Sequence, residues 1–151
     1  MLEAIKLIGA IVGLATGVFT VWDRWARGRP LAWLTATVRT AGTPPEMYIR
    51  ISNPGPTDVL IQSVRVRPAT YGVAKDHSAK GRKAFFEGVD LNLLLRLGKE
   101  HDLPIIEREN VSRRVCFFIY WRKTSSSYLR QFPVVIMTST HDIQRIAAAA
   151  S

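Results

Sequence analysis

The chain has 151 residues, which is enough for one domain of ordinary size and a short appendage. Lysine and arginine total 21 against 12 acidic residues, and the formal net charge of +9 favours anionic partners such as lipid headgroups, nucleotides or nucleic acid. After Pro30 there are 17 basic and 10 acidic residues, which leaves +7 on the later part, although such a charge also suits a merely soluble surface. The lone Cys116 excludes an intrachain disulfide and is typical of a reducing compartment.

The most informative segment is an uncharged run over residues 7–22. As a helix it would rise about 24 Å, less than the ~30 Å hydrocarbon core of a bilayer. The apolar residues before it lengthen the segment to about 21 residues if Lys6 extends its ammonium group toward the headgroups. We therefore predict that residues 1–30 form a transmembrane helix followed by a basic juxtamembrane segment.

Aromatic and basic residues stand at the end of this run and directly after it, as they do where a helix leaves a membrane. They are Trp22, Arg24, Trp25, Arg27 and Arg29, which we predict to lie at the membrane surface in contact with lipid. Positive charge is heavier after the helix than before it, which predicts a single-pass protein of a cell inner membrane with its C-terminal part in the cytoplasm. A cleaved signal peptide fits less well, because its basic region should precede the apolar run, and an in-plane amphipathic anchor is a second alternative.

Small and hydroxyl-bearing residues recur on one side of the same helix. Gly9, Gly13, Thr16, Gly17 and Thr20 fall within an arc of about 100° on a helical wheel. Lipid gains nothing from such a stripe, whereas a neighbouring helix can approach closely over it. We predict that the chain forms a homo-oligomer through this face. The alternative is that glycine is simply common in membrane helices.

After Pro30 the pattern changes from helical to alternating, which is typical of β-strands. Proline and glycine in residues 53–56 predict a turn, and a slip in the apolar alternation predicts a bulge at Gln62–Ser63. Residues 111–122 are apolar on both faces, which predicts a central strand covered on both sides. Pro133 places the last strand at an edge or a bulge. The expected strands are residues 31–40, 46–52, 58–68, 103–107, 111–122 and 130–140.

Many short strands separated by turns predict a mainly β domain over residues 31–146, built as an antiparallel β-sandwich or, alternatively, as a small β-barrel. Residues 69–90 are expected to form a long connecting loop rich in basic residues, and residues 91–98 a strand or one helical turn. The low-complexity residues 147–151 are predicted to be a disordered tail.

Several segments carry a resemblance to a known group of proteins. They are the tryptophan- and arginine-rich membrane exit, "IRISNPGPTDVLIQSVRVRP", "DLPIIERENVSRRVCFFI" and "FPVVIMTST". In this order they resemble small bacterial proteins with one N-terminal membrane helix and a C-terminal immunoglobulin-like β-sandwich domain, although residues 107–112 stand where such proteins often have a Pro-Gly turn. The resemblance implies this immunoglobulin-like architecture over about two thirds of the chain and no catalytic residue, because the group has no single activity.

Residues that could support catalysis are scattered along the chain. His77, His101 and His141 have no second ligand at a metal-binding offset, and Cys116 stands in an apolar run where a thiol behaves as a small hydrophobe. The sequence has no nucleophile-elbow, phosphate-loop or dinucleotide motif. We therefore predict that the protein is not an enzyme and uses no metal or cofactor.

Two groups of residues are candidates for binding an anion such as a nucleotide. The first combines cationic and aromatic side chains, and the second places two arginines on one face of a strand. The members are Lys80, Arg82, Lys83, Phe85 and Phe86 in the first group, and Arg65 and Arg67 in the second.

We consider three functions. The leading one is a non-enzymatic scaffold, an oligomeric membrane-anchored protein whose cytoplasmic β-sandwich binds another protein. The alternative is a ligand-gated membrane effector of bacterial antiviral defence, in which the basic sandwich senses a nucleotide-like anion and the glycine-striped helices perturb or permeate the membrane. A periplasmic binding module with the helix as its signal anchor is the third.

Overall fold

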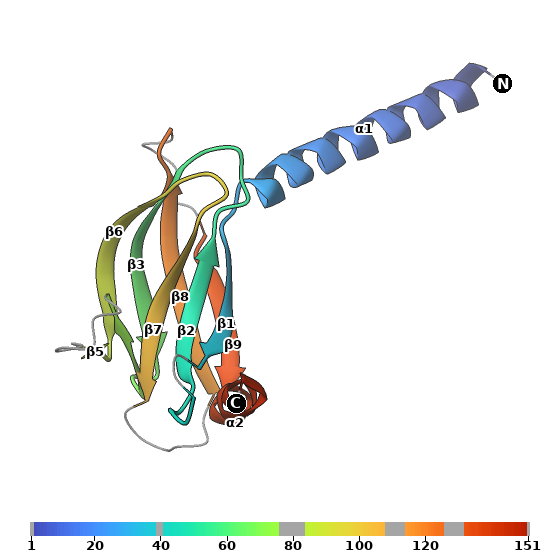
Figure 1. The fold of residues 1–151 in the computed structure, drawn as a ribbon. Helices are drawn as coiled ribbons and strands as arrows, with labels where there is room; N and C mark the ends of the chain where they lie inside the picture. Colours follow the sequence, from blue (N-terminus) through green and yellow to red (C-terminus); the bar gives the residue numbers. More distant parts are fainter. Residues whose placement is uncertain (1, 39–40, 76–83, 108–113, 126–131, 151) are drawn as a thin grey trace.

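The computed structural model shows one long N-terminal helix joined to a two-layered β domain (Figure 1). It describes residues 2–38, 41–75, 84–107, 114–125 and 132–150. Helix α1 spans Leu2–Arg27 and projects away from one corner of the domain. The chain then passes through a turn at Gly28 into the first strand.

The domain consists of two antiparallel sheets packed face to face. The first sheet has the order β1 (Leu31–Thr37), β2 (Glu46–Ser52), β7 (Glu100–Glu107), β4 (Tyr71–Ala74) and β5 (Ala84–Phe85). The second sheet has the order β6 (Gly88–Leu95), β3 (Val59–Arg67), β8 (Arg114–Lys123) and β9 (Val134–Ser139). The sheets do not close into a barrel, so the predicted β-sandwich is confirmed and the alternative barrel is wrong.

The strand order follows the immunoglobulin plan in most respects. Strands β1, β2, β7 and β4 occupy the places of the A, B, E and D strands, and β3, β8 and β9 those of C, F and G. Strand β6 lies beside β3, at the place of the additional C′ strand. The chain reaches β4 before β6, so the strands at the D and C′ places are exchanged in sequence order. The sandwich is therefore immunoglobulin-like, with its own connection between β3 and β7.

The hydrophobic core lies between the two sheets. It is built from the inward side chains, which occupy every second position along the strands. Ile49 and Ile51 of β2, Leu103 of β7, Ile61 of β3 and Phe117 of β8 are fully buried members of this one cluster. The spacing of two residues within each strand explains why the alternating pattern of the sequence predicted the strands.

Three predictions about the second sheet have definite outcomes. The register of β3 shifts between Ile61 and Ser63, which confirms the predicted bulge. Strand β9 is an edge strand, as predicted, and starts directly after Pro133. For residues 91–98 the prediction left a strand or a helical turn open, and the structure has a strand, β6, that ends at Leu95.

Strand β8 has the interior place that the sequence predicted, but the prediction that it is covered on both faces is wrong. Its inward side chains are buried, whereas Tyr120 on the outward face is 39% exposed. The reason is that the sandwich has two layers, so the outer surface of each sheet faces away from the core.

Two segments predicted to be irregular contain regular structure. Within the predicted loop of residues 69–90, Tyr71–Ala74 forms β4 with all four residues buried, because it pairs with β7. The predicted disordered tail, residues 147–151, is wrong as far as Ala150, since alanine is the best helix former and these alanines continue helix α2 (Thr140–Ala150).

Ser139 caps helix α2 at its N-terminus. Its Oγ accepts a hydrogen bond from the Asp142 backbone N–H (3.1 Å), as an N-cap serine does, and donates one to Asp142 Oδ2 (2.7 Å). The hydrogen bond from the Ser139 side chain lowers the pKa of Asp142, because it stabilises the charged carboxylate.

Candidate functional site

Helix α1 carries the glycine and threonine face for which the sequence analysis predicted self-association. Its segment Lys6–Asp23 is long and apolar enough to cross a membrane, and none of it is buried in the structure. At Gly9, Gly13 and Gly17, no atom other than those of the neighbouring residues and the adjacent helix backbone lies within 4 Å of the point where a Cβ would stand. Packing within this chain therefore gives no reason for the three glycines, and their face is open to a partner.

The threonine hydroxyls on this face are satisfied within the helix. Thr16 Oγ1 donates to the Val12 carbonyl oxygen and Thr20 Oγ1 donates to the Thr16 carbonyl oxygen, both at 2.8 Å. Since neither hydroxyl needs water as a partner, the face is compatible with apolar surroundings. A shallow groove on the helix is lined by Gly13, Leu14, Gly17, Val18, Val21 and Trp22.

At its C-terminal end α1 meets the sandwich through a short joint. Gly28 and Pro30 are buried, Arg29 is partly buried, and the Arg29 backbone N–H donates to the Ala26 carbonyl oxygen (3.3 Å). Trp22, which precedes the joint in the last turns of α1, is largely exposed. This is compatible with the predicted place of its ring at a membrane surface. The remaining predicted membrane-surface side chains, Arg24, Trp25 and Arg27, lie outside the described part of the structure.

A hollow of about 820 Å³ separates this joint from the loops of the sandwich. Arg29 and Leu31 line it from the joint, and Pro54, Pro56 and Lys123 line it from the loops. The end of the sandwich from which α1 leaves therefore combines basic and apolar side chains.

Asn53 fixes the loops at this end of the sandwich. Its side chain is 1% exposed; Nδ2 donates to the carbonyl oxygens of Thr57 (2.9 Å) and Leu95 (3.0 Å), and Oδ1 accepts from the Gly55 N–H (3.1 Å). The Asn53 backbone N–H and carbonyl also bond the turn between β6 and β7, at 3.0 and 2.8 Å. One buried residue thus joins two turns. The sequence predicted the first turn but not this role, for which the asparagine that opens it was the only signal.

The predicted anion-binding pair, Arg65 and Arg67, lies on the outer face of the second sheet. Both arginines line a hollow of about 620 Å³ that Glu87 and Tyr120 also line. Arg65 Nη2 lies 2.6 Å from Asp90 Oδ1, so the charge of one arginine is already compensated. An anion in this hollow would compete with Asp90 and meet Glu87, so the geometry is that of a cationic surface and not of a built anion pocket.

The other predicted anion-binding group is not brought to this pair. Phe85 lies on β5 in the first sheet and packs against the core, with Lys75 Nζ 5.9 Å from its ring centroid. Phe86 follows β5 and is partly buried. Phe85 and the two arginines therefore belong to different sheets. Lys80, Arg82 and Lys83 lie outside the described residues.

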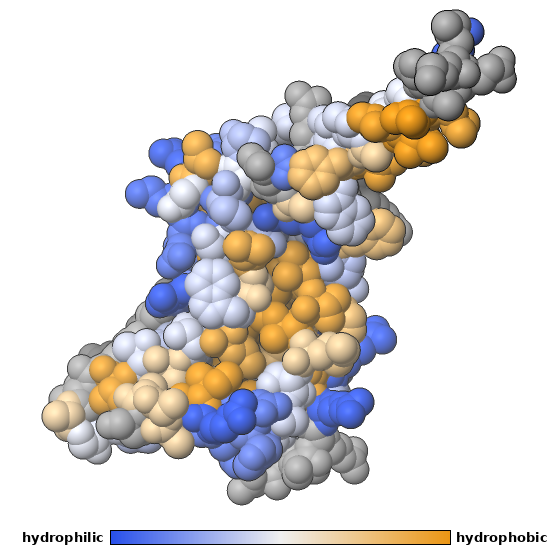
Figure 2. All heavy atoms as spheres, turned by 90° about the vertical axis from the view of Figure 1, so that its right-hand side faces the viewer, coloured by the Kyte–Doolittle hydropathy of each residue, from blue (hydrophilic) through white to orange (hydrophobic). Residues whose placement is uncertain are grey.

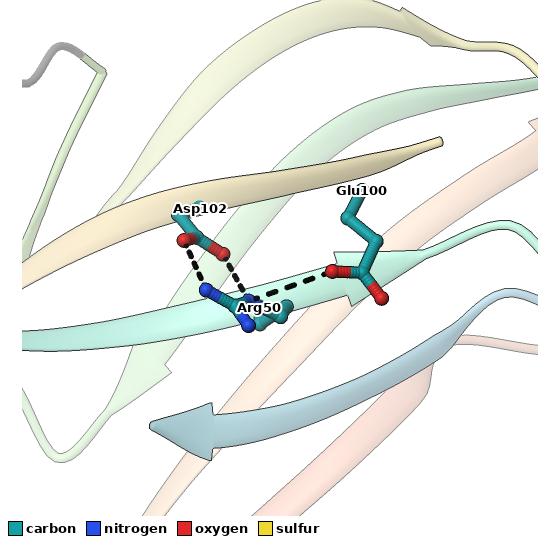
Figure 3. Close-up of polar contacts among 3 residues, drawn as sticks. All are labelled: Arg50, Glu100 and Asp102. Atoms are coloured by element: carbon teal, nitrogen blue, oxygen red, sulfur yellow. Dashed lines mark hydrogen bonds and ion pairs between the residues drawn. The ribbon is translucent and has the colours of Figure 1, made fainter. Parts of the chain in front are cut away.

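An ion-paired cluster on the outer face of the first sheet was missed by the sequence analysis (Figure 3). Arg50 of β2 donates two hydrogen bonds to Asp102 of β7, from Nε to Oδ1 (2.7 Å) and from Nη2 to Oδ2 (2.8 Å), and Glu100 Oε2 lies 3.8 Å from Nε. The hydrogen bonds to Asp102, and then its charge, raise the pKa of Arg50. Arg50 and Asp102 are 52 residues apart and meet only through the register of β2 with β7, so the sequence held no signal for the pair.

Tyr71 anchors the opposite end of the sandwich beneath α2. Its hydroxyl donates to Glu107 Oε1 (3.3 Å), and its ring lies 6.4 Å from that of Phe117 between centroids. Burial raises the pKa of Tyr71, and a hydrogen bond with Thr140 at the start of α2 acts in the opposite direction. The group stays protonated near neutral pH, and its contacts are those of a structural residue that joins β4, β7 and α2.

Within the described ranges, no three side chains of His, Cys, Asp or Glu come together in a way that could hold a metal ion. No family model matches the chain, and no curated protein matches it in sequence. Helix α1 and the surfaces of the sandwich are therefore the features from which a function can be inferred.

Proposed function

We propose that the chain is a non-enzymatic, single-pass membrane protein that self-associates through α1 and displays its β-sandwich in the cytoplasm to bind another protein. The observation that carries the proposal is α1 itself, an apolar span that is unburied and has an open glycine face. Exposed side chains such as Leu14, Phe19 and Val21 would be unfavourable in water. A bilayer removes this cost over most of the helix, and a second α1 removes it over the glycine face.

Self-association is tested by enlarging one glycine of the open face. We expect Gly13→Leu to lower the mass of the full-length protein in mild detergent to that of a monomer, because a leucine keeps two backbones apart where glycine allows close approach. The matched control is Val12→Leu, which adds bulk one residue away on the exposed lipid-facing side. Native mass spectrometry of both variants measures the result, and an unchanged oligomer in Gly13→Leu would overturn the role of this face.

The cytoplasmic location is supported by the basic residues that follow the helix. It is tested with a cysteine at the exposed position 37, in a Cys116→Ser background, and a maleimide that does not cross membranes. We expect labelling only after the cells are permeabilised. Labelling of intact cells would place the domain outside the cytoplasm and favour the periplasmic binding module.

The nucleotide-gated effector has less support than the scaffold. Arg65 is engaged by Asp90, and the described aromatic residue of the other group, Phe85, lies in the opposite sheet. A sensor domain would be stabilised by its ligand through mass action. A rise in the melting temperature of the full-length protein with a cyclic or linear nucleotide would therefore favour the effector over the scaffold.

A further inference from the structure

The outer surface of the second sheet has an apolar area at its β9 edge, which we call the β8–β9 face. It consists of Cys116, Phe118 and Tyr120 on β8 and Val135 and Met137 on β9, and Cys116 and Phe118 lie directly opposite Met137 and Val135. Met137 is 78% exposed. An antiparallel sheet with one face in water normally alternates apolar-in and polar-out, so this face has the composition of a surface that is covered.

Arginines border the β8–β9 face. Arg65 and Arg67 of β3 lie directly opposite two members of the face, and Arg114 and Arg122 stand at the two ends of the outward row of β8. Within the described ranges only Arg65 has an ion-pair partner among these four. An apolar centre with a cationic border matches a partner that is apolar inside and anionic at its surface.

Helix α1 leaves the sandwich on the side where β1 and β9 are the outermost strands (Figure 1). Seen from that side, the sandwich shows a broad apolar area below the base of the helix (Figure 2). The exposed side chains in these two edge strands include Leu31 and Trp33 of β1 as well as Val135 and Met137. The β9 edge therefore lies on the side of the domain toward which α1 extends.

We propose that the β8–β9 face docks on the surface of the same acidic phospholipid bilayer that α1 enters. The apolar side chains reach the boundary between headgroups and acyl chains, and Arg114 and Arg122 at the ends of the outward row of β8 contact lipid phosphates. A second copy of the chain fits less well, because a self-complementary contact would bring the arginine border of one copy against that of the other. This inference rests on the proposed membrane span of α1, and the experiment separates the two.

The test uses a full-length chain in vesicles of phosphatidylcholine with phosphatidylglycerol. A nitrobenzoxadiazole fluorophore is attached to one cysteine at a time in a Cys116→Ser background, and lipids that carry a shallow nitroxide act as quenchers. Met137→Cys reports on the face and Phe19→Cys on the span. Leu94→Cys is the control on the opposite edge strand, where the leucine is 48% exposed. We expect quenching at positions 137 and 19 and none at position 94.

Each outcome decides between the proposals. Quenching at position 19 without quenching at position 137 overturns the docking and leaves the span intact, whereas no quenching at position 19 overturns the span. The fluorophore at position 137 can also show the emission typical of apolar surroundings while lipid quenchers have no effect on it. That result means that a protein surface covers the face, and it also overturns the docking.

The arginine border gives a second measurement that does not depend on changing the apolar residues. Arg122→Gln removes one cation near the headgroups, so we expect the ratio of docked to undocked domain to fall about fivefold in the acidic vesicles. The control is Lys75→Gln, an exposed cation beside β5 at the far edge of the first sheet, which should leave the ratio unchanged. Equal effects of the two substitutions would overturn the role of the border.

Discussion

Replacing Asn53 with alanine removes a buried amide on which two turns of the sandwich depend. The side chain makes three hydrogen bonds to the backbone groups of Gly55, Thr57 and Leu95. Alanine keeps the backbone hydrogen bonds of residue 53 but leaves these three groups without their partner. Because residue 53 is 1% exposed, water has little access to replace the amide.

The expected cost follows from the burial of the three partners. A buried donor or acceptor that loses its hydrogen bond costs about 1–3 kcal/mol. The bonds to Gly55 and Leu95 lie in buried surroundings, whereas the bond to Thr57 is partly buried. We therefore expect the free energy of unfolding to fall by about 3 kcal/mol, which lowers the melting temperature of such a domain by about 10 °C.

Urea unfolding of the full-length protein in detergent measures this change, with the near-UV circular dichroism of buried aromatic residues such as Trp121 as the signal. The control is Gln62→Ala, which truncates an exposed amide on the bulge of β3 and should change the free energy of unfolding by less than about 0.5 kcal/mol. A loss below about 1 kcal/mol in Asn53→Ala would refute the reasoning, since the turns would then hold without the amide.

Three further predictions concern the sandwich. Gly88 has a φ of +135°, and an added Cβ would stand 2.4 Å from a carbonyl oxygen of β3, so Gly88→Ala should unfold at a much lower urea concentration than the wild type; an unchanged midpoint would contradict this. Arg50→Ala and Asp102→Ala should show a coupling of about 1 kcal/mol in a double-mutant cycle of unfolding, a small value because both side chains are partly exposed, and additive effects would reject the pair as a brace. Asp142 has a lowered pKa in the folded chain, so its contribution to stability is fully present above the ordinary carboxyl pKa of 3.8 and is lost as the pH falls through the lower folded value. The melting temperature of Asp142→Asn should therefore fall less on acidification than that of the wild type, and equal falls would count against the contact between Ser139 and the Asp142 carboxylate.

Strands were predictable from the sequence where one face is buried and the other is exposed, because apolar and polar residues then alternate. The alternation in β2 located a strand to the residue, and the slip of that alternation in β3 located its bulge between Ile61 and Ser63. Both follow from the two-residue period of a strand, which is a local property. The same local reasoning failed for β8, because an apolar outward face looks alike whether it is covered by this chain or by a partner.

Elements that depend on distant partners were not predictable in this way. Strand β4 has only four residues, and its pairing with β7 decides its conformation. Helix α2 was missed for a different reason, because its signals are few in a short helix that ends in alanines. They are the N-cap pair Ser139 and Asp142 and the buried Ile143.

The same distinction holds for the candidate sites. The glycine face of α1 could be described from the sequence because the residues that form it lie within about three turns of a single helix. The contacts of Arg50 with Asp102, and the arginine border of the β8–β9 face, depend on strand register and could not.

Strand β1 is the mechanical link between helix α1 and the rest of the domain. Helix α1 ends at Arg27, β1 begins at Leu31, and β1 is an edge strand held to β2 by seven consecutive residue pairs. A pull along the strand strains all of these pairs together, as in a shear geometry, whereas a sideways pull peels them apart one after another. The tether therefore resists tension strongly in one direction and yields in the other.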